Sequence, residues 1–171
     1  SEPEYLKVIG EIEGLVLDES QWLKHYYVAL CYILASMQPL SPNQKDFYLD
    51  EAEKQVRILE LQRKNDDEVL TLKAFWLQAK IMVSVLTRGP VHIKEAEKYL
   101  KEAQALNPKN PRVYFLLGQA MLNKPSFIGG GKKSAMPYLT KAKSLFGRFE
   151  PQKMGYPDWG EKQTDELLAS F

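Results

Sequence analysis

The spacing of apolar residues predicts a chain made of helices. Apolar side chains recur every three residues at positions 6, 9, 12 and 15, so we expect a helix over Pro3–Leu17 with one apolar face. The next helix is predicted over Trp22–Met37. Within it Tyr26–Met37 carries no charge, but this stretch is shorter than the roughly 18 apolar residues of a membrane span. No segment has a convincing strand pattern, and the sequence therefore indicates an all-α protein of about eight helices.

Start and stop signals divide the rest of the chain. Ser41-Pro42-Asn43-Gln44 supplies an N-cap serine, a proline at the first helical position and a capping-box glutamine, so a helix is expected to run to Arg63. Asn65-Asp66-Asp67-Glu68 repeats the capping-box pattern, with Asn65 as the N-cap, and opens the next helix, which Arg88-Gly89-Pro90 should end after Thr87. Further helices are predicted over His92–Leu106, from Asn110 to Asn123, and from Asp158 to the C-terminus.

A pattern of small and large residues recurs in three of the segments. Each copy has the same spacing of four and then three residues, which suits helices that cross their partners closely. A small residue also recurs in the preceding helix of each pair, at Ala29, Ala74 and Gly118. The three copies are Ala52, Val56 and Leu59; Ala96, Leu100 and Ala103; and Ala135, Leu139 and Ala142.

These residues resemble the tetratricopeptide repeat (TPR) family over about 22–149. Tyr114, Leu117 and Gly118 stand where that family has its aromatic-x-x-Leu-Gly core, and Pro108 stands at its closing proline. The periods of about 45 and 44 residues exceed the family's 34, and His25 and Lys73 depart from the core pattern. The segments "WLKHYYVALCYI", "TRGP", "FIGGGKK" and "DWG" are also similar to a group of short bacterial TPR-like proteins.

The resemblance implies a right-handed superhelical stack of antiparallel helix hairpins and no enzymatic activity. It predicts one domain over 1–171, with an N-terminal capping helix at 1–21, hairpins at 22–66, 67–110 and 111–149, and a C-terminal capping segment at 150–171. Successive first helices of such hairpins line a concave face that binds proteins or peptides. The groove-facing residues carried over from the family are Tyr26, Glu68, Thr71, Phe75, Gln78, Arg112, Phe115 and Gln119.

Two alternatives concern this expected groove. In the first, the helix Pro3–Leu17 lies in the groove and buries its aromatic rings, since Leu30 and Ile33 are too apolar to stay in water. In the second, the apolar surface joins copies of this chain into a weak homo-oligomer; without such contacts the protein is expected to be a monomer. We also expect Trp159 to fold the C-terminal segment back over the last hairpin and so close the end of the stack.

The glycine-rich stretch "KPSFIGGGKKSAMP" at Lys124–Pro137 has the look of a phosphate loop. The Walker motif requires a glycine, four residues, and then glycine, lysine and serine or threonine. Here Ser126 stands at the position of the first glycine, and Lys133 stands at the position of the final serine or threonine. A weaker anion site is the remaining possibility, formed by Gly130, Gly131, Lys132, Lys133 and Ser134 at a helix start. We expect Ser134 to be the N-cap, because Pro137 then falls in the first turn. The alternative is that the glycines serve only the turn geometry.

Composition narrows the class of function. The formal net charge of +1 and the absence of a basic stripe with interleaved aromatic residues argue against nucleic acid as a partner. His25 and His92 fall in different hairpins, and Cys31 lies in an apolar helix, so we expect no metal site, no cofactor and no catalytic residue. The sequence predicts a protein- or peptide-binding module.

Overall fold

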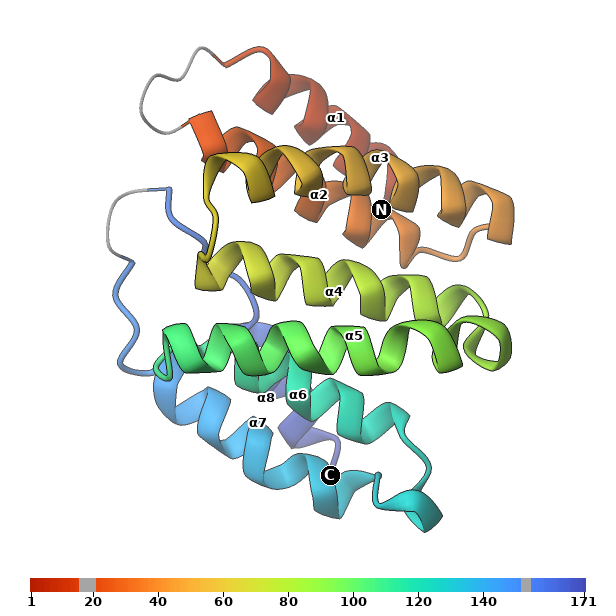
Figure 1. The fold of residues 1–171 in the computed structure, drawn as a ribbon, viewed down its shortest axis with the longest axis vertical. Helices are drawn as coiled ribbons and strands as arrows, with labels where there is room; N and C mark the ends of the chain where they lie inside the picture. Colours follow the sequence, from red (N-terminus) through yellow and green to blue (C-terminus); the bar gives the residue numbers. More distant parts are fainter. Residues whose placement is uncertain (16–20, 152–154) are drawn as a thin grey trace. The chain divides into compact units, whose positions relative to one another are not determined.

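The fold is all-helical in the part of the chain that the computed structural model describes, namely residues 1–15, 21–151 and 155–171. These residues form eight α-helices and one short 3-10 turn, with no strand among them (Figure 1). The chain divides into two compact units, Ser1–Tyr99 and Leu100–Phe171. The division falls within one helix, α5 (Val85–Leu106).

The first unit is built from consecutive antiparallel helices. α1 packs on α2, α2 on α3 and α3 on α4, and α2 also touches α4 (Figure 1). Its core consists of apolar side chains at helical spacing that are fully buried, as the periodic pattern requires. The helices are α1 (Glu2–Glu13), α2 (Gln21–Ser36), α3 (Pro42–Gln62), α4 (Asp67–Val83) and the first part of α5.

α1 covers one particular face of α2. Ile9 is buried against Val28 and Cys31, on the side of α2 opposite Tyr26, so this helix does not lie on the predicted groove face. Burial raises the pKa of the Cys31 thiol, which keeps it protonated and unreactive. A hydrogen bond from the Tyr48 hydroxyl to the Glu2 carboxylate ties the start of α1 to α3. The predicted helix end at Leu17 lies outside the described residues.

Helix starts in this unit follow the capping signals. The Gln44 amide donates to Ser41 Oγ at 3.4 Å and the Ser41 amide donates to Gln44 Oε1 at 3.2 Å, which completes the predicted capping box. Asp66 Oδ1 accepts from the amides of Glu68 and Val69 at the start of α4. The first start is the predicted one, whereas the N-cap of α4 is Asp66 and not Asn65 of the predicted capping box.

The break between α4 and α5 lies at Ser84, and the predicted break at Arg88-Gly89-Pro90 is wrong. Ser84 has extended backbone angles, φ −156° and ψ 91°, and its Oγ accepts a 2.7 Å hydrogen bond from the Thr87 hydroxyl. α5 then continues through Pro90. Because the Pro90 nitrogen carries no hydrogen, the Leu86 carbonyl has no hydrogen-bond donor within the helix. Leu86 is 91% exposed, so water can donate to that carbonyl instead.

The second unit contains the last part of α5, α6 (Pro111–Asn123), the 3-10 turn η1 (Ser126–Ile128), α7 (Lys132–Phe146) and α8 (Glu161–Ala169). α7 packs on both α6 and α8. The Trp159 and Phe115 rings meet in a T-shaped contact with a centroid distance of 6.3 Å, so the segment before α8 folds back over α6 as expected. The α6–α7 packing is close because Gly118 faces Leu139 directly.

The repeated small and large residues are all buried. Each copy of the pattern is at most 3% exposed, in both units. The small residues of the preceding helices are buried as well, including Ala29 and Ala74 at 0%. The periodicity therefore identified real packing positions. The members of the pattern are Ala52, Val56, Leu59, Ala96, Leu100, Ala103, Ala135, Leu139 and Ala142.

The close contact at Gly118 gives the first prediction. A Cβ at this position would lie 2.6 Å from Leu139 Cδ2, so Gly118→Ala should lower the free energy of unfolding by about 1–2 kcal/mol, despite the better helix propensity of alanine. Urea denaturation measures the change. The control is Gly147→Ala, where φ is −63° and the nearest atom is 3.7 Å away. Equal stabilities of the two variants would contradict the packing described.

Candidate functional site

The glycine-rich turn between α6 and α7 has a backbone that only glycine can adopt. Gly129 and Gly131 have φ of 88° and 86°. A Cβ on Gly130 would lie 2.0 Å from the Lys124 carbonyl oxygen. The amides of Gly129, Gly130 and Gly131 donate to the carbonyls of Ser126, Pro125 and Met121, respectively. These three amides are therefore committed within the turn, and its glycines are explained by chain geometry.

α7 begins at Lys132, three residues before the predicted start, and the expectation that Ser134 is its N-cap is wrong. Gly131 is the N-cap, because its positive φ turns the chain so that its carbonyl accepts from the amides of Ser134 and Ala135 at 3.1 and 3.0 Å. Pro137 consequently lies in the second turn of the helix. This start places Lys132 and Lys133 on a helix rather than in a loop.

A hollow opens beside these lysines. It has a volume of about 490 Å³, within the range of about 300–1,000 Å³ typical of small-ligand sites. Residues four apart along α7 form two neighbouring rows in its lining, and Phe171 completes it from the end of the chain. The lining residues are Lys132, Met136 and Thr140, then Lys133 and Pro137, then Phe171.

Sequence reasoning had found the two lysines but not the apolar half of this hollow. Met136 and Thr140 follow Lys132 at intervals of four, a signal that becomes readable once the helix is known to start at Lys132. Phe171 could not be placed from sequence, because it reaches α7 only through the return of α8. Lys132 Nζ lies 5.3 Å from the centroid of the Phe171 ring and donates a 2.7 Å hydrogen bond to the Ser170 carbonyl.

The surroundings of the hollow are basic. Between Glu102 and Glu150 the sequence contains eight lysines and arginines and no acidic residue. The second unit as a whole carries eleven basic and six acidic residues, whereas the first unit carries twelve basic and sixteen acidic residues. On α8, Asp165 pairs with Lys143 at 2.8 Å and Glu166 lies 3.8 Å from Lys162. The arrangement suits a ligand that is apolar over most of its surface and carries carboxylates.

The predicted groove residues are mostly buried in their own units. Tyr26 and Thr71 are 0% exposed, and the Tyr26 hydroxyl donates to Glu68 at 3.2 Å. In the second unit Trp159 contacts Phe115. Only the two glutamines are partly exposed. The remaining members of the set are Phe75 at 4%, Glu68 at 9%, Arg112 at 1% and Phe115 at 2%, with Gln78 and Gln119 intermediate.

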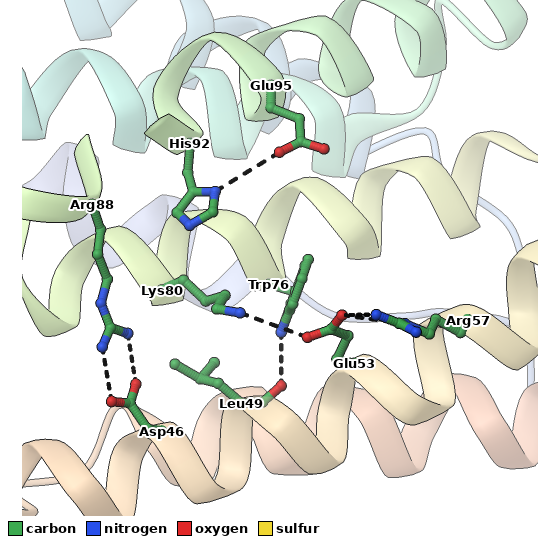
Figure 2. A network of polar contacts seen from close by, with 9 residues as sticks. All are labelled: Asp46, Leu49, Glu53, Arg57, Trp76, Lys80, Arg88, His92 and Glu95. Atoms are coloured by element: carbon green, nitrogen blue, oxygen red, sulfur yellow. Dashed lines mark hydrogen bonds and ion pairs between the residues drawn. The ribbon is translucent and has the colours of Figure 1, made fainter. Parts of the chain in front are cut away.

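A second polar cluster joins α3, α4 and the start of α5 in the first unit (Figure 2). Trp76 Nε1 donates to the Leu49 carbonyl at 2.8 Å, and Lys80 Nζ lies 4.5 Å from the centroid of the Trp76 ring and 3.6 Å from Glu53. Burial raises the pKa of Glu53, but the hydrogen bond from Arg57 and the charge of Lys80 outweigh it, so the pKa is lowered overall. The cations here are already neutralised by carboxylates.

The two histidines belong to the first unit. His25 Nδ1 is 2.8 Å from Gln55 Oε1, and His92 Nδ1 is 3.8 Å from Glu95 Oε2, beyond hydrogen-bond length. In the described ranges, no three His, Cys, Asp or Glu side chains are grouped so as to hold a metal ion. None of the helices described there is long and apolar enough to cross a membrane.

Comparison with known proteins gives one informative likeness. No family model and no curated protein matches the sequence. The structure is similar to the solved structure of the HusA haemophore from Porphyromonas gingivalis, with a TM-score of 0.85 and 29% sequence identity. The match covers 99% of this chain and 84% of that chain, so the likeness extends over both units.

The ion pair between Asp46 and Arg88 generates a prediction about pH. Arg88 Nη1 and Nη2 bond the two Asp46 oxygens at 2.6 and 2.8 Å, and this hydrogen bonding lowers the pKa of Asp46. Ionised Asp46 therefore stabilises the fold above its unfolded pKa of about 4, and the effect is lost as the pH falls through the folded pKa. Asp46→Asn should lower the melting temperature by roughly 1–3 °C at pH 7 and by almost nothing near pH 2.

Thermal denaturation followed by circular dichroism measures this difference at each pH. The matched control is Asp50→Asn, an exposed carboxylate one turn further along α3, which should change the melting temperature less at pH 7. A pH-independent difference between wild type and Asp46→Asn would contradict the assigned ion pair.

Proposed function

We propose that this protein is a non-enzymatic binder of haem or a closely related tetrapyrrole. The observation that carries the proposal is the likeness to the HusA haemophore, which extends over 99% of this chain at 29% identity. The TM-score of 0.85 supports the same arrangement of helices in both proteins. It favours binding of a ligand over catalysis.

The chemistry of the described surface supports the same role. A tetrapyrrole such as haem is a planar apolar ring that carries two carboxylates at one edge. The second unit offers an excess of basic residues together with exposed apolar side chains, such as Met136 at 40% and Phe127 at 86% exposure. Apolar contact and charge-assisted hydrogen bonds are the two interactions that such a ligand requires.

Binding of a protein or peptide, as the TPR resemblance implies, is a second candidate. The observation in its favour is a run of exposed apolar side chains around the α4–α5 junction, because such patches often mark protein contacts. They are Met82 at 53%, Val85 at 53%, Leu86 at 91%, Val91 at 64% and Ile93 at 45% exposure. The same surface would serve a homo-oligomer.

A haemin titration tests the proposal. We expect the Soret band to shift and to saturate at one haemin per chain, with a dissociation constant of roughly 1 µM or lower, which corresponds to about −8 kcal/mol. The same titration with the protein unfolded in guanidinium chloride is the control. A non-saturating change that equals the control would contradict the proposal and favour the protein-binding candidate.

A further inference from the structure

We propose that the hollow on the first turns of α7 is the tetrapyrrole site, with Lys132 and Lys133 binding the two carboxylates and the macrocycle resting against Met136, Pro137 and Phe171. The inference rests on the haem-binding role proposed above and assigns that role to specific residues. Three observations support it: the hollow itself, the lack of ion pairs at the two lysines among the described residues, and the positive charge of the surrounding hairpin.

The two lysines keep their full charge available. Lys132 donates to a neutral carbonyl, that of Ser170, and neither lysine has an ion pair with any residue in the described part of the chain. A carboxylate is a stronger partner for an ammonium group than a carbonyl is, so exchange of one for the other is favourable. Lys132 and Lys133 both line the hollow, so two cations are available for the two carboxylates of the ligand.

The apolar side of the hollow suits the macrocycle. Met136, a flexible and polarisable side chain, lies one turn beyond Lys132 and is 40% exposed. The Phe171 ring already has a cation near it, since Lys132 Nζ is 5.3 Å from its centroid. When Lys132 turns to a carboxylate, that ring becomes free to stack on the macrocycle.

The cluster in the first unit is a weaker candidate for the same ligand. It contains His92, whose imidazole could ligate iron, and two cations within the same network (Figure 2). Those cations are committed, however, because Arg88 bonds both oxygens of Asp46 and Lys80 lies 3.6 Å from Glu53. A carboxylate ligand would have to displace an existing carboxylate there, whereas at the hollow it displaces none.

The experiment compares Lys132→Ala/Lys133→Ala with wild type in two titrations. The first ligand is protoporphyrin IX, which has both carboxylates, and the second is its dimethyl ester, which has none. The double variant should bind the free acid roughly tenfold more weakly than wild type does and bind the ester equally well. Phe171→Ala should weaken the binding of both ligands, because it removes a contact to the ring.

Two further variants complete the design. Lys109→Ala/Lys141→Ala removes the same charge from exposed positions of the second unit outside the hollow, and it should change the affinity less than twofold. His92→Ala should leave the affinity for haemin unchanged. Circular dichroism confirms that each variant is folded.

The outcomes separate the site from the function. If wild type binds haemin but the Lys132→Ala/Lys133→Ala variant binds the free acid as well as wild type, the site is wrong and the proposed function stands. A large loss in His92→Ala would move the site to the first unit. If wild type binds neither haemin nor protoporphyrin IX, the proposed function fails, and the site fails with it.

Discussion

The close approach of α6 and α7 is the constraint on which the candidate site depends. Gly118 lets the two helices meet at Leu139, and Gly130 lets the turn between them pack on the Lys124 carbonyl. Any side chain at either position would meet atoms well inside contact distance. Gly131, whose positive φ turns the chain, is the N-cap of α7, so the helix starts at Lys132 and its first two turns carry two lysines and Met136, which line one hollow.

Charge is distributed unevenly between the units, although the whole chain is almost neutral. The second unit has a formal excess of five positive charges and the first an excess of four negative charges. In the first unit, carboxylates neutralise the cations of the polar cluster, as Asp46 does for Arg88. In the hollow, Lys132 contacts the Ser170 carbonyl and the Phe171 ring, and neither Lys132 nor Lys133 forms an ion pair with a carboxylate among the described residues. An anionic ligand is therefore attracted to the second unit, although the net charge of +1 gives no sign of it.

Local signals in the sequence predicted much of the fold. The capping residue Ser41 and the repeated small residues were identified correctly, because a cap or a packing stripe depends on neighbours along one helix. The N-cap of α4 is Asp66, one residue after the predicted Asn65. The break at Ser84 and the start of α7 were not identified correctly, since they depend on tertiary contacts and on the φ of Gly131. The sequence pointed to the basic part of the candidate site, Lys132 and Lys133, as a possible anion site. The other part needs Phe171, which only the folded chain brings to α7.

The central claim is that a carboxylate-bearing tetrapyrrole binds at the first turns of α7. Its most direct test is a series of two-dimensional amide NMR spectra of the isotope-labelled chain during addition of iron-free protoporphyrin IX, because the ring current of the macrocycle shifts nearby amide signals. We expect the largest shifts on Gly131–Thr140 and on residues 169–171. Shifts concentrated around His92, or spread evenly over both units, would contradict it.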